Sequence, residues 1–106
     1  MKRYCLFEGR HELPTNEGAL CSGFNFNTLK SDKTPLWKEA LQELEGGNNI
    51  GIYVTGLTPA LTEFLHHADH CMWEAGLYDN NAPLRKCCIM LYHYNSQTGE
   101  YVEQTF

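Results

Sequence analysis

Basic side chains are scarce in this sequence. It has 8 Lys and Arg residues against 13 Asp and Glu residues, which gives a formal net charge of −5. Proteins that grip DNA or RNA need clustered Lys and Arg to neutralise the phosphate backbone, so we do not expect a nucleic-acid polymer as a partner. A small anionic ligand remains compatible with this charge, because one Arg and the N-terminus of a helix can hold a phosphate.

Long apolar runs are missing as well. No segment approaches the roughly 20 apolar residues that a membrane-spanning helix needs, and residues 1–5 lack the apolar core and cleavage site of a secretory signal. The five cysteines are odd in number and form no Cys-x-x-Cys pair, which is typical of reduced thiols. We therefore expect a cytoplasmic protein that does not bind a membrane.

The signature motifs of several enzyme classes are absent. The sequence contains no Gly-x-Ser-x-Gly, no Walker lysine motif and no Gly-x-Gly-x-x-Gly. These motifs mark serine hydrolases, NTPases and dinucleotide enzymes respectively. We expect no cofactor, and binding is favoured over catalysis, although the question of enzymatic activity stays open.

The order of predicted elements indicates one α/β domain over residues 1–106. Residues 15–33 are expected to form an irregular loop that Phe24 and Phe26 anchor to the core. Alternating strands and helices predict a parallel sheet with helices on its faces. We expect a small Rossmann-like three-layer domain with three parallel strands and a C-terminal antiparallel strand. The expected strands are 2–7, 50–54, 86–94 and 100–106, and the expected helices are 35–45 and 59–72.

Residues 50–61 are the stretch around which the chain is organised. Ile52, Tyr53 and Val54 are the β-branched and aromatic residues of a buried strand. Gly56 allows a tight turn, and Thr58 followed by Pro59 is typical of a helix N-cap and first turn. A strand that passes through such a turn into a helix leaves backbone N–H groups and a positive helix dipole at one point, which favours an anion site.

Candidate ligand-binding residues gather where the three parallel strands end. Right-handed crossovers place the carboxyl ends of these strands along one edge, where ligands of open α/β sheets bind. Arg10 can pair with a phosphate, the 55–58 turn can cradle it, and the 15–33 loop can close the pocket. A histidine can donate a hydrogen bond or act as a general base, and Tyr94 can stack on a base. The alternative is that these residues only form surface ion pairs and helix caps. The candidates are Arg10, His11, Glu12, Thr55, Gly56, Leu57, Thr58, His93 and Tyr94.

Two further clusters have simpler interpretations. His66 and His70, and likewise His67 and Cys71, stand four residues apart on the second predicted helix, a spacing that can chelate a metal. No further ligands are evident, so we expect a solvated helix face and no metal site. The adjacent cysteines at positions 87 and 88 point to opposite faces of a strand and cannot easily bridge each other.

Several segments carry a resemblance to known proteins. They are 9–14 (Gly-Arg-His-Glu-Leu-Pro), 16–18 (Asn-Glu-Gly), 53–61 (Tyr-Val-Thr-Gly-Leu-Thr-Pro-Ala-Leu), 92–94 (Tyr-His-Tyr) and 99–101 (Gly-Glu-Tyr). The whole chain resembles small proteins of bacterial phages and mobile elements. Its expected architecture is similar to that of the viral and CRISPR-associated ring nucleases, which are Rossmann-like dimers that bind cyclic oligonucleotide messengers. Phage proteins that sequester such messengers are a related class.

The candidate site, the resemblance and the acidic charge lead to three hypotheses. The first is a homodimer in the cytosol of a bacterial or phage-infected cell that binds a small phosphate-bearing ligand. That ligand would be a cyclic nucleotide second messenger, sequestered so that a phage evades host defence. The second is a ring-nuclease-like phosphodiesterase that uses His11 or His93, although no residue aligns with a ring nuclease's catalytic histidine. The third is a protein-interaction module that inhibits a host factor.

Overall fold

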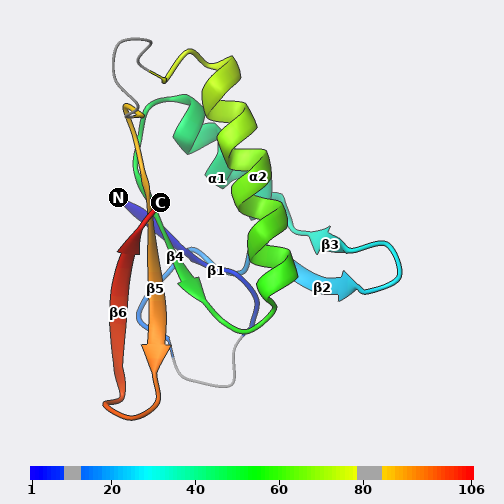
Figure 1. Ribbon diagram of the computed structural model, residues 1–106, viewed down its shortest axis with the longest axis vertical. Helices are drawn as coiled ribbons and strands as arrows, with labels where there is room; N and C mark the ends of the chain where they lie inside the picture. The colour runs from blue at the N-terminus through cyan, green and yellow to red at the C-terminus, as the bar shows by residue number, and fades with distance from the viewer. Residues whose placement is uncertain (9–12, 79–84) are drawn as a thin grey trace.

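Two helices and two sheets make up the part of the chain that the structure describes (Figure 1). The computed structural model describes residues 1–8, 13–78 and 85–106. In chain order the elements are β1 (Lys2–Cys5), β2 (Cys21–Asn25), β3 (Lys30–Lys33), α1 (Pro35–Glu45), β4 (Ile50–Val54), α2 (Thr58–Glu74), β5 (Ile89–Asn95) and β6 (Glu100–Thr105).

The main sheet has the strand order β1-β4-β5-β6. Strands β1, β4 and β5 are parallel, and β6 runs antiparallel to β5. The α/β class, the three parallel strands and the C-terminal antiparallel strand are therefore confirmed. None of the described helices is both long enough and apolar enough to cross a bilayer.

Both helices pack against one face of the main sheet. Tyr4, Ile52 and Leu91 join buried residues of α1 and α2 in the main core. Tyr53 and Tyr92, which point the other way, belong to a separate cluster that contains no residue of either helix. The strand order explains this, because three parallel strands laid down in one direction with right-handed crossovers receive both helices on the same side. The predicted three-layer arrangement is thus not confirmed.

Helix α1 has the predicted bounds because both of its ends are marked in the sequence. The Thr34 hydroxyl accepts a hydrogen bond from the Leu36 N–H at 3.2 Å, and Pro35 occupies the first turn. At the other end the Gly46 N–H bonds to the Gln42 carbonyl at 3.0 Å, and Gly47 adopts φ +83°.

The segment that was expected to be irregular contains a β-hairpin. Strands β2 and β3 pair antiparallel and project away from the main sheet (Figure 1). Phe24 packs against the core, as predicted. The prediction is wrong for Phe26, which lies in the hairpin turn with 64% of its surface exposed. Its ring rests edge-on against Phe24, with the ring centroids 4.9 Å apart.

Glu63 ties α2 to the β2–β3 hairpin and makes stability depend on pH. Its carboxylate accepts the Ser31 N–H at 2.8 Å and lies 3.4 Å from the Lys33 ammonium. Burial opposes its ionisation, but the hydrogen bonds from Ser31 and the Lys33 charge outweigh this, so the pKa of Glu63 is held below its ordinary value of 4.5. A lowered folded-state pKa contributes stability above the unfolded pKa, and that stability is lost as pH falls through the folded value.

We therefore expect the Glu63→Gln variant to lose less stability on acidification below about pH 4.5 than the wild type does. Thermal melts in a pH series from neutral to acid measure the difference. Equal slopes for the two proteins below that pH would contradict the assignment.

Candidate functional site

The carboxyl ends of β1, β4 and β5 meet at one edge of the main sheet, as predicted. The pairing of β1 with β4 continues past the strand end, where the Leu6 N–H donates to the Tyr53 carbonyl at 3.0 Å. On the other side of β4, Val54 pairs with His93. The turn that follows β4 is therefore flanked by the end of β1 and the end of β5.

Thr55 links two of these strand ends through its side chain. Its hydroxyl accepts a hydrogen bond from the Phe7 N–H at 3.1 Å and donates one to the Phe7 carbonyl. The hydroxyl proton is thereby committed to Phe7. In this structure Thr55 holds the end of β1 against the turn.

The turn after β4 leads into α2 differently from the prediction. Gly56 has φ +78°, a conformation that favours glycine, and a Cβ at this position would meet nothing within 4 Å. The helix begins at Thr58, and Leu57 is the N-cap, without a side-chain hydrogen bond. The prediction that Thr58 caps α2 is wrong, because Leu57 occupies the cap position and its carbonyl accepts the Ala60 N–H at 3.0 Å.

The backbone N–H groups of this turn form the candidate anion site. Within the described part of the chain, no hydrogen bond engages the N–H groups of Gly56, Leu57 or Thr58. They are successive amides at the positive end of a 17-residue helix. Successive backbone amides in a turn can bind an anion, and the helix dipole adds to this.

The two candidate residues from β5 lie on opposite faces of the sheet. His93 faces the helix-bearing side, where its Nε2 is 2.8 Å from the Gln104 Oε1. Tyr94 faces the other side, where its ring centroid is 5.5 Å from that of Tyr101. Side chains of neighbouring residues in a strand point to opposite faces of the sheet. A ligand at the carboxyl edge can therefore contact His93 only on the helix-bearing face and Tyr94 only on the opposite face.

The remaining candidates, Arg10, His11 and Glu12, lie outside the described residues. Glu8 is the last described residue before them, and it is exposed at the end of the β1 segment. Their place at the site therefore stays a prediction.

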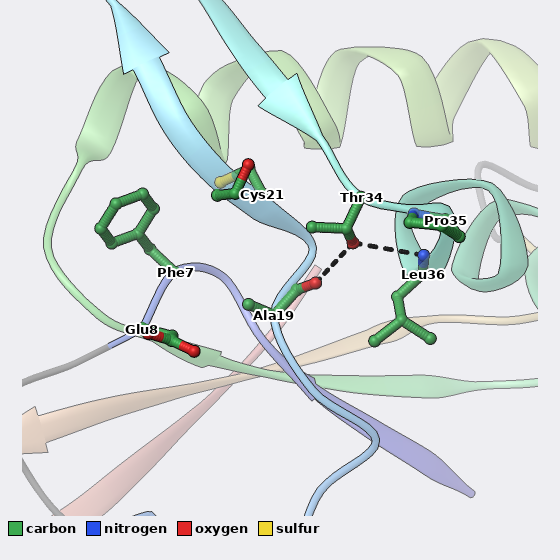
Figure 2. Close-up of a pocket in the computed structure, with 8 residues that line it drawn as sticks. Phe7, Glu8, Ala19, Cys21, Thr34, Pro35 and Leu36 are labelled. Carbon is green, nitrogen blue, oxygen red and sulfur yellow. Dashed lines mark hydrogen bonds between the residues drawn. The ribbon is translucent and has the colours of Figure 1, made fainter.

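A pocket of about 450 Å³ lies beside this edge (Figure 2). Three segments far apart in the sequence form its wall: the end of the β1 segment, the start of β2 and the N-terminus of α1. Sequence reasoning missed it because no local pattern brings these segments together. The lining residues are Phe7, Glu8, Ala19, Cys21, Ser22, Thr34, Pro35 and Leu36.

The polar groups of the pocket wall are mostly satisfied within the protein. The Thr34 hydroxyl donates to the Ala19 carbonyl at 2.6 Å and caps α1, so the N-terminus of this helix is closed to an anion (Figure 2). The Cys21 thiol donates to the Leu6 carbonyl at 3.0 Å, and burial raises the pKa of Cys21, which makes it a poor nucleophile. The pocket thus suits the apolar or ring portion of a ligand.

Aromatic side chains cluster on the sheet face opposite the helices. Tyr53 and Tyr92 are stacked, with ring centroids 4.9 Å apart. The Arg3 guanidinium donates to the Tyr53 hydroxyl at 3.2 Å and lies 5.1 Å from the centroid of the Tyr92 ring. Burial raises the pKa of the Tyr92 phenol although the Arg3 charge works against this. These contacts consolidate this face of the sheet, as a cation–π pair does.

The histidine-rich face of α2 has no metal-binding arrangement in the structure. Among residues 1–8, 13–78 and 85–106, no group of three or more His, Cys, Asp and Glu side chains could hold a metal ion. The ring of His67 lies edge-on to the buried Trp37 at 5.8 Å. The Nε2 of His70 lies 3.1 Å from the Glu74 carboxylate in solvent.

Comparison of the chain with protein-family models, with curated proteins and with solved structures gives no match. Function is therefore inferred from the chemistry of the carboxyl edge.

Proposed function

We propose that the protein binds a small phosphate-bearing ligand at the carboxyl edge of the main sheet. The phosphate lies on the backbone N–H groups of residues 56–58 at the N-terminus of α2. The observation that carries the proposal is that these amides have no partner in the described chain and stand beside open space at Gly56. Amides in this arrangement bind anions without a cluster of basic side chains.

The contrast between the two helices supports this choice. In α1 the Thr34 hydroxyl occupies the first-turn amide of Leu36. Helix α2 has no such cap, and it is also the longer helix, with 17 residues against 11. Its positive end therefore remains open, and the macrodipole effect on an anion acts within the first turn of a helix.

The pocket beside the edge provides room for the rest of the ligand. Phe7 connects the two parts of the site, because its backbone bonds to Thr55 and it lines the pocket. A volume of about 450 Å³ lies within the range of small-molecule sites, roughly 300–1,000 Å³. A nucleotide has both parts that this site would hold, namely an aromatic ring for the pocket and a phosphate for the turn.

A cyclic nucleotide second messenger is the ligand that the sequence resemblance suggests. In this proposal Arg10 adds a charge-assisted contact to the phosphate, and the protein sequesters the messenger during phage infection. The proposed position follows the general rule that ligands of open α/β sheets, Rossmann-like ones among them, bind outside the carboxyl ends of parallel strands.

Titration calorimetry with a panel of cyclic nucleotides tests the proposal on the wild type, on Arg10→Ala and on Gly56→Ala. We expect one ligand to bind the wild type, and Arg10→Ala to bind it at least tenfold more weakly, since loss of a charge-assisted hydrogen bond costs roughly 1.5–3 kcal/mol. We expect Gly56→Ala to weaken binding as well, because the added Cβ stands in the open space beside the turn amides. Failure of every cyclic nucleotide to bind would remove the support for a messenger.

Gly99→Ala is the matched control for Gly56→Ala. Gly99 has φ +73°, close to the +78° of Gly56, and a Cβ at either position meets nothing within 4 Å. The two substitutions therefore carry a similar backbone strain. Equal losses of affinity in the two variants would show that strain, and not the turn amides, is responsible.

The fate of the ligand separates a binding protein from a phosphodiesterase. His93 lies at the same edge, and its ring is held by Gln104. We expect labelled messenger to be recovered intact after the protein is denatured. A linear product would instead show cleavage, and its loss in His93→Ala or His11→Ala would identify the histidine involved.

A further inference from the structure

The two edges of the main sheet differ in how they are covered. Beyond β1, the Glu17 N–H donates to the Arg3 carbonyl at 2.8 Å and the Cys5 N–H donates to the Gly18 carbonyl at 2.9 Å. The chain thus pairs with its own first strand. At the opposite edge, no described residue pairs with the outer side of β6.

The backbone groups that β6 presents outward follow from its pairing with β5. Ile89 and Phe106 exchange two backbone hydrogen bonds, of 3.0 and 2.8 Å. Because such mutually bonded pairs alternate along an antiparallel ladder, Gln104 and Val102 also turn their N–H and C=O groups toward β5. Tyr101, Glu103 and Thr105 therefore direct theirs away from the sheet.

Apart from the charges of Glu100 and Glu103, strand β6 lacks the features by which edge strands usually avoid pairing. Its sequence, Glu-Tyr-Val-Glu-Gln-Thr, contains no Pro and no Lys, and its register with β5 runs without a bulge. Val102 exposes 54% of its surface near the middle of the strand. A regular edge with unpaired backbone groups is a template for another strand.

We propose that β6 pairs antiparallel with the β6 of a second copy of this chain, with the two Val102 side chains facing each other on the two-fold axis. This joins the two four-stranded sheets into one continuous sheet. The inference goes beyond the ligand site, since β6 contributes nothing to the turn or to the pocket.

The pattern of charges and faces is compatible with this register and disfavours the one centred on Glu103. Opposite residues of an antiparallel pair share a face, so even-numbered residues of β6 must face even-numbered ones. With Val102 on the axis, Tyr101 and Glu103 exchange backbone hydrogen bonds across the interface, and Glu100 faces Gln104. A shift that places Glu103 on the axis would set two carboxylates directly opposite, which is destabilising. The strand is thus complementary to itself. An interface with two-fold symmetry uses the same strand of both copies, so the assembly is a closed dimer.

Sedimentation equilibrium of the wild type and of Val102→Lys tests the pairing. We expect the wild type to sediment with twice the 12.2 kDa chain mass. The single Lys–Lys pair on the axis, together with the loss of the apolar Val102 contact, should weaken the dimer by roughly tenfold. A wild type that stays monomeric up to roughly millimolar concentration, or a dimer that Val102→Lys leaves unchanged, would overturn the proposal.

Oxidative cross-linking tests the register and does not depend on the Lys variant. A pair on the axis that is not hydrogen-bonded has Cα atoms about 4.5 Å apart, which lies within the range of a disulfide. We expect Val102→Cys to form a cross-linked dimer under mild oxidation, whereas wild type and Gln104→Cys do not. A cross-link in Gln104→Cys but not in Val102→Cys would overturn the register. Circular dichroism of each variant checks its fold.

Discussion

Replacing Phe64 with alanine is expected to lower the free energy of unfolding by about 3–5 kcal/mol, the usual cost of deleting a buried aromatic side chain. Phe64 is fully buried on α2. Its ring meets the Trp37 ring of α1 edge-on, with centroids 4.9 Å apart and an interplanar angle of 85°. The pair joins the two helices over one face of the sheet, so the cavity opens where both helices meet it. Urea denaturation measures the loss.

The same substitution at Phe26 provides the control. Phe26 lies in the β2–β3 turn and is largely exposed. Its replacement should change the stability by no more than about 0.5 kcal/mol, as at most surface sites. If Phe64→Ala cost as little as Phe26→Ala, the packing of both helices on one face would be contradicted.

Replacing Thr55 with valine is expected to lower the free energy of unfolding by about 1–3 kcal/mol, because the partly buried backbone groups of Phe7 lose their hydrogen-bond partner. The substitution keeps the shape of the side chain and removes the hydroxyl. That hydroxyl serves the N–H and the carbonyl of Phe7, so both groups lose their partner together. We also expect ligand binding to weaken, since the end of β1 and the turn are no longer held together.

Thr62→Val is the matched control for this prediction. The Thr62 hydroxyl is exposed and bonds only to the Thr58 carbonyl of its own helix, at 3.1 Å. Its removal should change stability by about 0.5 kcal/mol or less. Similar stability and similar binding in Thr55→Val and wild type would show that the link between Thr55 and Phe7 does not organise the site.

The two Thr-Pro pairs show what the sequence can and cannot predict about the helices. Thr34-Pro35 and Thr58-Pro59 look the same as helix starts, yet only Thr34 caps its helix. At α1 the Thr34 hydroxyl can bond both to the Ala19 carbonyl and to the first turn. At α2 the positive φ of Gly56 brings Leu57 into the cap position. This difference comes from how the preceding strand ends, which the dipeptide does not encode.

The β2–β3 hairpin was not predicted because its turn lacks the usual signal. Tight hairpins favour Asn-Gly or Asp-Gly at positions with positive φ. Here Leu29 adopts φ 55° within the turn, which is uncommon for a residue other than Gly, Asn or Asp. The alternation of Phe24 and Phe26 was the available signal. The predicted anchoring to the core holds for Phe24 alone.

The candidate site was predictable where it depends on strand order. The convergence of the ends of β1, β4 and β5 followed from alternating strands and helices, and the register confirms it. The pocket was not predictable, because it needs Phe7, Cys21 and Leu36 to meet in space. The strand ends are set by local patterns together with the rule of right-handed crossovers, whereas the pocket wall depends on tertiary packing.

The claim that the amides of residues 56–58 bind a phosphate is tested most directly by NMR. Isotope-labelled protein is titrated with inorganic phosphate and then with the cyclic nucleotide that binds most tightly. We predict that the amide signals of Gly56, Leu57 and Thr58 shift most in both titrations, whereas those of Leu36 and Trp37 at the capped start of α1 stay in place with inorganic phosphate. Unchanged signals at residues 56–58 under saturating ligand would contradict the account.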